Sequence, residues 1–303
     1  MTFASIIMPA FNVQSTMRHT LDALLAQTYP RFEIIIVDDG STDSTLKIAA
    51  EYAADPRVRV IRQANRGLAG ARNTGIAAAR GEVIGFCDAD DLWVPHKLTG
   101  QAQRPRLQGV SAGHIFKRNP IGNGSAPVIR RAVLEQIAYR PRHETMRDWI
   151  FDETFRQSED IECWLRIALT TDWTFEGVPG LLTHYRINAG GLSAATDRQL
   201  AAWERMVEKL TPLNPAFFTV NTPAARAYQL RYLCRRAISD LDAPRAQSLS
   251  RAWIAQSRTP LVEEPVKSLA TLAASTLLSA FGGNVLRRVM MLAQRLRPAG
   301  AIQ

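Results

Sequence analysis

The sequence predicts an α/β fold, with a mostly parallel sheet flanked by helices and a helical extension at the C-terminus. Strand-like and helix-like segments alternate over about the first 90 residues, which is typical of parallel sheets covered on both faces. The run Glu33–Val37 is nearly continuously apolar and β-branched, as in a strand buried on both faces. After Leu200 the pattern is helical and rich in Ala and Arg.

The individual elements follow from local patterns. Strands are expected over 5–8, 33–37, 57–61 and 83–87. Helices are expected from the cap residues Ser15 and Asp43, and over the Ala-rich stretch 67–80. From 98 to 124 the periodicity fades among prolines and glycines, which predicts an irregular crossover. A strand that leads into a short helix is expected over 125–134, and a helix with one apolar face over 159–169.

The composition limits the class of protein. The 303 residues are 46% hydrophobic and 21% charged, which is ordinary for one folded domain with an appendage. A net charge of +9 favours polyanionic partners and leaves anionic lipid, nucleic acid and phosphorylated substrates open. Three scattered cysteines predict neither a disulfide framework nor a zinc site. The first four residues lead straight into a strand, so we expect a cytoplasmic protein without a secretory signal.

Polar residues follow each of the first four predicted strands. The strand ends read Pro9-Ala10-Phe11-Asn12, Asp38-Asp39-Gly40-Ser41, Asn65-Arg66-Gly67 and Asp88-Ala89-Asp90-Asp91. Ligands of open parallel sheets bind beyond the carboxyl ends of the strands, so these segments predict one binding site. No G-x-G-x-x-G follows the first strand and no G-x-x-x-x-G-K-[ST] occurs, which leaves a dinucleotide or P-loop site without support.

The acidic tetrad Asp88–Asp91 indicates a metal. In an extended stretch Asp88 and Asp90 point to the same side, because side chains alternate along a strand. Paired carboxylates suit Mg²⁺ or Mn²⁺ that bridges substrate phosphates, whereas carboxylates alone repel a diphosphate. Asp91 has a structural alternative as the cap of a helix that begins near Pro95.

The other strand ends carry weaker signals. Asp38 and Asp39 are natural turn residues, yet one of them can accept a hydrogen bond from the N–H of a nucleotide base. Gly67 permits close backbone approach, and Arg72 can pair with a phosphate. Gly70 and Gly75 also permit close backbone approach, with close packing of a helix as the structural alternative.

Together these segments resemble the family 2 glycosyltransferases, which have the GT-A fold. The matching stretches are SIIMPAFN (5–12), EIIIVDDGSTDST (33–45), NRGLAGARNTGIAAARGE (65–82), FCDADD (86–91), SEDIECWLRIA (158–168) and HYRINAGGLS (184–193). They occur in the family's order over about two-thirds of the chain. The similarity is greatest to bacterial enzymes of exopolysaccharide synthesis, which usually act with inversion. The Q-x-x-R-W signature of processive synthases is missing and no spanning helices are expected, which argues against polymerisation.

The resemblance implies roles for individual residues. Asp39 would contact the base, often uracil, Asp88 would lie near the ribose, and Asp90 would hold Mn²⁺ or Mg²⁺ on the diphosphate. Asp160 would be the catalytic base. In the mechanism that we expect from these residues, Arg72 or Arg186 helps the metal to stabilise the leaving diphosphate. The donor-binding set is Pro9, Phe11, Asp38, Asp39, Asn65, Gly67, Arg72, Asp88 and Asp90, of which Asp88 and Asp90 are the metal ligands.

The resemblance also implies the substrates and the division of the chain. The donor would be a nucleoside-diphosphate sugar, preferably a UDP-sugar, and the acceptor a glycan or a lipid-linked saccharide, with no nucleic acid bound. Residues 1–115 would form the nucleotide-sugar-binding half of the GT-A domain and 116–200 its acceptor-binding half. Residues 201–303 would form a helical, basic extension.

Several residues keep structural alternatives. Glu159 and Asp160 also complement the dipole of the helix that they begin. Trp164 falls on the apolar face of that helix and is expected in the core. Trp149 and Tyr185 are expected either to stack on a sugar or to be buried.

The C-terminal segment 268–298 combines an uncharged run with an amphipathic stretch that carries arginines. It is expected either to lie on an anionic membrane surface, at the inner face of the cytoplasmic membrane, or to pack on the catalytic domain. Two other functions stay open for the whole chain. One is a basic polyanion-binding protein without catalysis, against which the acidic site argues. The other is a sugar nucleotidyltransferase, whose Gly-rich N-terminal loop with Arg and Lys is missing.

Overall fold

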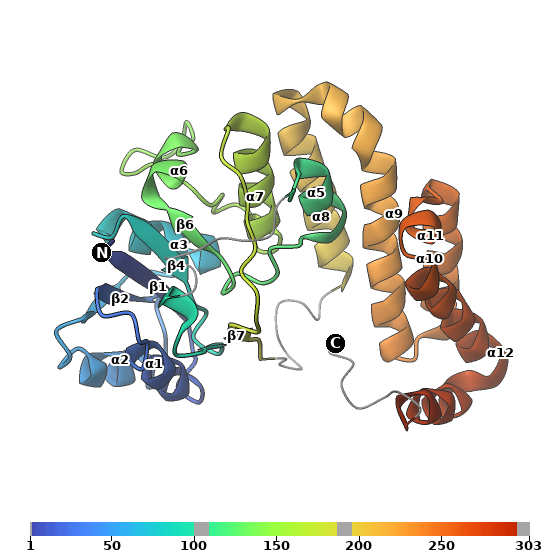
Figure 1. The fold of residues 1–303 in the computed structure, drawn as a ribbon, viewed down its shortest axis with the longest axis horizontal. Helices are drawn as coiled ribbons and strands as arrows, with labels where there is room; N and C mark the ends of the chain where they lie inside the picture. The colour runs from blue at the N-terminus through green and yellow to red at the C-terminus, as the bar shows by residue number, and fades with distance from the viewer. Residues whose placement is uncertain (1, 100–108, 187–195, 296–303) are drawn as a thin grey trace. The chain divides into compact units, whose positions relative to one another are not determined.

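The computed structural model describes residues 2–99, 109–186 and 196–295 and divides the chain into two compact units. The first unit comprises residues 1–195 and 201–213, and the second comprises 196–200 and 214–303. Figure 1 shows the order of the elements along the chain. In the first 195 residues they are β1 (Ala4–Ala10), α1 (Met17–Leu25), β2 (Phe32–Asp38), α2 (Thr45–Tyr52), β3 (Val58–Arg62), α3 (Gly67–Ala78), β4 (Val83–Phe86), β5 (Leu92–Trp93), α5 (Ala112–Arg118), β6 (Val128–Arg130), α6 (Arg131–Gln136), α7 (Glu159–Thr170) and β7 (Thr183–His184).

The main sheet has the strand order β3-β2-β1-β4-β6. Its first four strands are parallel and only β6 is antiparallel, which confirms the predicted mostly parallel sheet. Strand β1 pairs with β2 from Ala4↔Phe32 to Ala10↔Asp38, and both strands are buried along their whole length. Strands β5 and β7 form a separate antiparallel pair.

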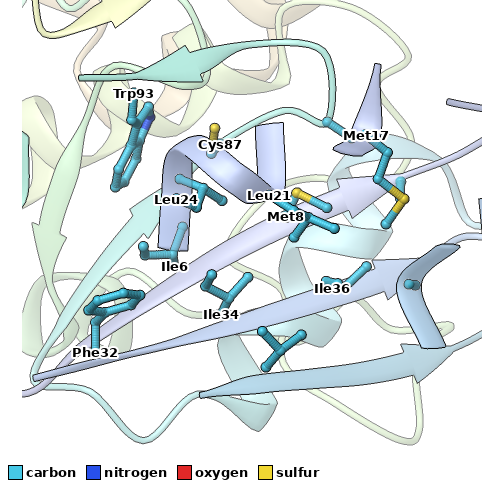
Figure 2. Packing of buried hydrophobic residues seen from close by; sticks show 14 of the residues in the cluster. Ile6, Met8, Met17, Leu21, Leu24, Phe32, Ile34, Ile36, Cys87 and Trp93 are labelled. Atoms are coloured by element: carbon cyan, nitrogen blue, oxygen red, sulfur yellow. The ribbon is translucent and has the colours of Figure 1, made fainter. Parts of the chain in front are cut away.

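Side chains alternate between the two faces of the sheet. Ile6 and Met8 of β1 share a core cluster with residues of β2, α1 and α2, among them Leu21 and Leu24 (Figure 2). Ile7 faces the other way, against α3, where an added Cβ on Gly75 would lie 2.3 Å from Ile7 Cγ2. The packing alternative for Gly75 is therefore confirmed, because only a glycine lets the helix approach the strand this closely.

The prediction was wrong in the crossover after Leu98. Residues 100–108 lie outside the described residues, but the stretch expected to be irregular contains helix α5. Ser111 caps it by accepting a hydrogen bond from the N–H of His114, and His114 returns a side-chain bond to the cap, which forms a capping box. A capping box normally carries Glu or Gln at the third position, so a histidine there hides the signal. The helix begun near Ser15 likewise starts later, at Met17.

The described residues from 196 to 295 are mostly helical, as predicted for the chain after Leu200. Its elements are α8 (Thr196–Leu210), a 3₁₀ turn (Thr211–Leu213), α9 (Pro215–Ser239), α10 (Ala243–Gln256), α11 (Thr259–Glu263) and α12 (Pro265–Arg295). Asn214 and Asp242 cap α9 and α10 with their side chains. In the second unit the fully buried Trp253 lies in a core cluster with residues of α9 and α12.

Candidate active site

The carboxyl ends of β3, β2, β1 and β4 lie next to one another at one edge of the sheet, because these strands are parallel neighbours. Pro9 is buried within β1, and Phe11, just beyond it, is 48% exposed. Asn65 is exposed in the loop after β3. The loops after β1 and β2 are joined, since Asn12 Oδ1 accepts a hydrogen bond of 2.8 Å from the N–H of Thr42. The fold thus brings the four predicted strand ends together.

Asp39 is buried and its carboxylate faces the start of α3. One oxygen accepts hydrogen bonds from the Arg66 N–H at 2.8 Å and from Gln63 Nε2 at 2.6 Å. The other accepts the Gly67 N–H at 2.8 Å, where Gly67 has a φ of +76°. The carboxylate therefore satisfies N–H groups at the helix start that have no partner within the helix. It also fixes the loop that carries Asn65.

Asp38 ends β2 and is fully buried. Its Oδ1 accepts the Ser41 N–H at 3.3 Å, whereas Oδ2 has no hydrogen-bond partner among the described residues and lies 3.8 Å from Arg62 Nε. A buried carboxylate oxygen without a donor is costly, which favours a donor that arrives with a ligand. A cavity of about 400 Å³ is lined by Gly40, Arg62, Gln63 and Ala64.

The tetrad forms a turn. The Asp91 N–H donates to the carbonyl oxygen of Asp88 at 3.0 Å, so Asp88–Asp91 closes back on itself before β5. The expected alternation of Asp88 and Asp90 along an extended strand is therefore wrong, because strand β4 already ends at Phe86. The Asp88 side chain is 24% exposed, and Asp90 is half-buried.

Asp91 is not a helix cap, so that alternative was also wrong. The residue is fully buried, and its carboxylate accepts the Arg186 N–H at 2.9 Å and an N–H of Asn123 at 3.1 Å. Arg186 Nε in turn donates to the carbonyl oxygen of Asp90 at 2.9 Å. Burial raises the pKa of Asp91 to about 6, and the charges of Asp88 and Asp90 act in the same direction. Asp91 thereby ties the distant segments at 123 and 186 to the tetrad.

Arg72 connects the tetrad to α7. Its Nη2 donates to Asp88 Oδ1 at 3.0 Å and its Nη1 donates to Glu159 Oε1 at 2.9 Å. The side chain is 2% exposed and lies over the ring of Phe151, 5.4 Å from the centroid. Its two terminal nitrogens are thus committed to carboxylates. The predicted phosphate-binding arginine is placed so that it holds Asp88.

Asp160 lies in the first turn of α7 beside Glu159. One Asp160 oxygen accepts the Ile161 N–H at 2.8 Å. Burial raises the pKa of Asp160, against the lowering effect of the Arg72 charge. Burial also raises the pKa of Glu159 to about 7, with the neighbouring Asp160 charge adding to the effect. A carboxylate with a raised pKa in a polar site is suited to accept a proton near neutral pH.

The carboxylates of Asp88 and Asp90 fit a divalent cation that is also bound by substrate phosphates. Among the described residues, no group of three or more His, Cys, Asp and Glu side chains is arranged to hold a metal ion. Asp88 and Asp90 offer two carboxylates, which is the usual protein contribution where Mg²⁺ is also bound by substrate phosphates and water. The residues present therefore match an open site rather than a closed metal centre.

A larger cavity of about 960 Å³ lies along β6, the edge strand of the sheet. Its lining includes residues of the loop 120–127, of β6 and of the segment 173–185. Asn123 and Tyr185 belong to this lining, and Asn123 also binds Asp91 of the tetrad. The cavity thus reaches the candidate site from the side opposite β3.

Four aromatic residues near the candidate site differ in exposure, two being exposed and two buried. Tyr185 is 54% exposed and Trp173 39% exposed, and both line the cavity along β6. Trp149 is 4% exposed and donates to Glu144 Oε2 at 3.1 Å, so it belongs to the core. Trp164 is 1% exposed, which confirms its predicted place in the core.

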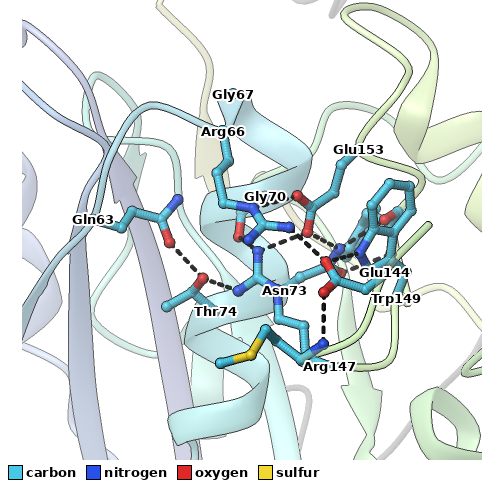
Figure 3. A network of polar contacts seen from close by, with 12 residues as sticks. Gln63, Arg66, Gly67, Gly70, Asn73, Thr74, Glu144, Arg147, Trp149 and Glu153 are labelled. Carbon is cyan, nitrogen blue, oxygen red and sulfur yellow. Dashed lines mark hydrogen bonds and ion pairs between the residues drawn. The ribbon is translucent and has the colours of Figure 1, made fainter. Parts of the chain in front are cut away.

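A polar network next to Asp39 was missed by the sequence analysis (Figure 3). Arg66 donates to Glu153 and Glu144, each at 2.7 Å, and Arg147 donates to Glu153 at 2.7 Å. Asn73 donates to Glu153 Oε1 at 3.0 Å. These contacts tie α3 to the segment 144–153, which leads to Asp160. The Arg66–Glu144 and Asn73–Glu153 contacts join residues 78 and 80 positions apart in sequence, so no local spacing reveals them.

The amino-acid sequence is similar to a known protein family and to individual members of it. Residues 5–159 match the model of the glycosyl transferase family 2. EpsJ of Bacillus subtilis, described as an uncharacterized glycosyltransferase, is 37% identical over 185 residues, which cover 52% of this chain and 53% of EpsJ. The Escherichia coli protein WfgD, a UDP-Glc:α-D-GlcNAc-diphosphoundecaprenol β-1,3-glucosyltransferase, is 26% identical over 240 residues, which cover 75% of this chain and 90% of WfgD. The match thus spans about half the length of EpsJ and nearly all of WfgD.

Two solved structures share the fold. Residues 1–349 of TarS from Staphylococcus aureus, in complex with UDP-GlcNAc, superpose with a TM-score of 0.56 at 17% identity and cover 98% of this chain and 93% of theirs. The mannosyltransferase PcManGT from Pyrobaculum calidifontis, in complex with GDP-Man and Mn²⁺, gives a TM-score of 0.59 at 20% identity, with 92% and 87% covered. Since the family model matches just over half of the chain, including all four strand ends and the start of α7, the chain belongs to the family 2 glycosyltransferases and has their GT-A fold.

Proposed function

We propose that the protein is a metal-dependent, inverting glycosyltransferase that moves a sugar from a nucleoside-diphosphate sugar to a glycan or lipid-linked acceptor in polysaccharide synthesis. The observation that carries the proposal is the bridge made by Arg72 between Asp88 and Glu159. It holds the acidic strand end and the α7 segment with Asp160 in one site. A donor group and a base for the acceptor must be held together for a direct displacement between two substrates.

The nucleotide is assigned to the carboxyl ends of β2 and β3. Among the described residues no donor forms a hydrogen bond with the buried Asp38 Oδ2, which lies 3.8 Å from Arg62 Nε, and Asp39 lies next to it. The N3–H of uracil is a suitable donor, which supports a UDP-sugar, with Phe11 and Asn65 exposed at the same edge. TarS and PcManGT were determined with UDP-GlcNAc and GDP-Man, and these ligands support a nucleoside-diphosphate sugar in general.

Asp90, together with Asp88, is the proposed ligand of Mn²⁺ or Mg²⁺. When bound with the diphosphate, the cation would act as a Lewis acid that offsets the charge of the leaving group. The presence of Mn²⁺ in PcManGT supports this choice of cofactor. Arg186 donates to the carbonyl oxygen of Asp90, so its guanidinium lies at the tetrad and adds positive charge there.

Asp160 is the proposed base. It accepts the proton of the acceptor hydroxyl while that oxygen bonds to the anomeric carbon, and the bond from this carbon to the diphosphate oxygen breaks. The nucleoside diphosphate then leaves with the bonding electron pair. A single displacement of this kind inverts the anomeric configuration. The raised pKa of Asp160 makes the carboxylate a stronger base than an exposed aspartate.

The cavity along β6 is the proposed acceptor site. It is lined by the exposed Tyr185 and Trp173, and aromatic faces of this kind stack on sugar rings. The name of WfgD identifies its acceptor as a saccharide on diphosphoundecaprenol, which supports a lipid-linked acceptor here. Such an acceptor would place the protein in the cytoplasm, at the inner face of the membrane.

A binding screen tests the donor site directly. UDP-, GDP- and dTDP-sugars are added with and without Mn²⁺, and the melting temperature is recorded for the wild type, Asp90→Ala and the surface control Asp172→Ala. We expect a Mn²⁺-dependent rise with one nucleotide class, retained in the control and lost in Asp90→Ala. The proposal fails if no donor raises the melting temperature, or if the rise is indifferent to metal and to Asp90.

A further inference from the structure

Over its first three turns, helix α12 buries a row of polar side chains beside Leu272, which packs against the core cluster of the second unit, and it exposes Val266 and Leu269 on either side of Lys267. Ser268, Thr271 and Ser275 are 0%, 5% and 2% exposed, whereas Val266 and Leu269 on the outer side are 80% and 59% exposed. Helices of soluble proteins usually bury the apolar stripe and expose the polar one. A buried polar row together with exposed large apolar side chains calls for an explanation.

Hydrogen bonds within the second unit fix this orientation. Ser268 Oγ accepts from Arg231 Nη1 at 2.5 Å and donates to the carbonyl oxygen of Pro260 at 2.5 Å. Arg231 also pairs with Glu264, directly before α12. Rotation of the helix to bury Val266 and Leu269 would break these contacts and leave the Arg231 charge without its partners. The apolar outer face is therefore a fixed surface.

Beyond the exposed Lys267, which pairs with Glu264, the helix carries no charge over a long stretch. Residues 268–286 contain no Asp, Glu, Lys or Arg. Further along, the helix exposes Phe281 at 64%, Val285 at 39% and Val289 at 41%. We call Val266, Leu269 and Phe281 the outer face of α12; Val285 and Val289 lie beyond the break at Gly282. A helix surface that meets only water normally carries charged residues, so an apolar partner is indicated.

The surrounding charge selects the kind of partner. Residues 214–303 hold twelve Lys and Arg against four Asp and Glu, a net charge of +8 out of +9 for the chain. From 265 to 303 there are five basic residues and no acidic one. Arg287 and Arg288 are exposed beyond the break at Gly282, between Val285 and Val289. Apolar side chains flanked by arginines fit the boundary between the acyl chains and the anionic headgroups of a membrane.

The helix geometry favours a helix that lies on the membrane over one that spans it. The stretch Pro265–Val289 is long and apolar enough to cross a bilayer, and 22% of its apolar window is buried. Gly282 interrupts it with φ 76° and ψ 174°, which leaves 17 residues before the break. A span needs about 20 residues and cannot leave backbone groups unpaired in the hydrocarbon core. Residues 296–298 of the predicted membrane segment lie outside the described residues.

We propose that the outer face of α12 docks on an anionic membrane surface, with Arg287 and Arg288 against lipid phosphates. This surface extends the proposed location at the cytoplasmic membrane but does not depend on sugar transfer. Its test measures lipid binding alone, so failure of the docking surface and failure of the transferase proposal are separate results.

The experiment is co-sedimentation of the full chain with two kinds of vesicle. One is pure phosphatidylcholine, and the other contains about 30 mol% phosphatidylglycerol, roughly the anionic share of a bacterial-type membrane. We expect the wild type to bind the anionic vesicles about tenfold more tightly than the neutral ones. Leu269→Asp with Phe281→Asp should lose most of the binding, and Arg287→Gln with Arg288→Gln should weaken it about tenfold on anionic vesicles only. The matched control is Val220→Asp on α9, whose side chain is 75% exposed, and it should bind like the wild type.

Four outcomes would overturn the docking surface. The first is wild-type protein that stays in the supernatant with anionic vesicles. The second is binding that Leu269→Asp with Phe281→Asp leaves unchanged, although circular dichroism shows both proteins folded. The third is a self-association of the wild type that this variant abolishes without any lipid binding, which would assign the outer face to a second copy of the chain. If an alkaline buffer does not extract the bound protein from the vesicles, α12 spans the membrane and does not dock on its surface.

Discussion

Arg72 Nη1 lies 2.9 Å from Glu159 Oε1, and this buried ion pair joins α3 to the first turn of α7 across 87 positions of sequence. The two side chains are 2% and 8% exposed. Gly124 leaves room for the same guanidinium to reach Asp88, since a Cβ there would lie 2.1 Å from Arg72 Nη2. Arg72 therefore links the first turn of α7, which carries Asp160, directly to the tetrad.

Removal of that arginine should destabilise the fold. Arg72→Met leaves Glu159 and Asp88 without a counter-charge, and loss of one partner of a buried ion pair costs about 3–5 kcal/mol. The double variant Arg72→Met with Glu159→Gln has one unpaired buried carboxylate fewer than Arg72→Met, so it should regain part of the lost stability. The free energies of unfolding in urea at pH 8, above the pKa of about 7 of Glu159, give the coupling. Strictly additive losses would show that the pair contributes nothing as a pair.

Asp160→Asn should stop transfer and spare donor binding. Asn keeps the shape of the side chain but accepts no proton, and general-base catalysis is worth about 10²–10⁴-fold in rate. Steady-state kcat with saturating donor and acceptor measures the loss, and the thermal shift with donor and Mn²⁺ measures binding. Equal losses in both would mean that Asp160 organises the donor site instead.

The raised pKa of Asp160 predicts how the rate of transfer depends on pH. Burial raises the pKa of Asp160, and the base acts in its ionised form. The kcat should therefore rise with pH through that pKa, and the acid limb should lie above the ordinary aspartate value of about 4. Asp172→Asn on the surface should show the same limb as the wild type. A rate that is flat down to pH 4 would remove Asp160 as the base.

Asn73→Ala should cost stability without touching the donor site. Asn73 Nδ2 donates to the Phe151 carbonyl oxygen at 2.7 Å, and Oδ1 accepts the N–H groups of Ile150 and Phe151 at 3.1 and 2.9 Å. Alanine leaves these buried backbone groups unpaired, at about 1–3 kcal/mol for each unsatisfied group. Urea unfolding measures the loss.

The matched control for this change is Asn65→Ala, because Asn65 is exposed in the loop beside Asp39. It should unfold like the wild type but bind the donor more weakly. If Asn65→Ala loses as much stability as Asn73→Ala, the network of Figure 3 is not what holds α3 to the segment 144–153.

The parallel sheet and its strand ends could be predicted because their signals are local. The apolar run of β2 and the polar residues directly after it lie within a dozen positions, and parallel neighbours must deliver those residues to one edge. The turn at Asp88–Asp91 and the roles of Asp91 and Arg72 could not be predicted in this way. Their partners at Asn123, Arg186 and Glu159 come from distant segments whose approach depends on the tertiary fold.

Lys97 is a further residue that no sequence pattern indicated. It is 1% exposed, lies 4.4 Å from the centroid of the Trp93 ring, and donates to the carbonyl oxygens of Ser125 and Ala126 at 2.8 and 3.0 Å. Ser125 Oγ accepts the Asp88 N–H at 2.8 Å, so the lysine supports the loop that backs the tetrad. Burial lowers the pKa of Lys97 to about 7.

This lowered pKa predicts how stability changes with pH. Between about pH 7 and pH 10 the unfolded chain binds a proton at Lys97 that the folded protein does not, so folding becomes more favourable as the pH rises. The contribution has a slope of up to about 1.4 kcal/mol per pH unit in that window. Lys97→Met removes the slope, and the exposed Lys47→Met retains it. Urea unfolding at pH 7.5, 8.5 and 9.5 should therefore show the wild type and Lys47→Met gaining stability relative to Lys97→Met at each step. Parallel curves for all three proteins would mean that Lys97 stays protonated in the folded state, held by Ser125, Ala126 and the ring of Trp93.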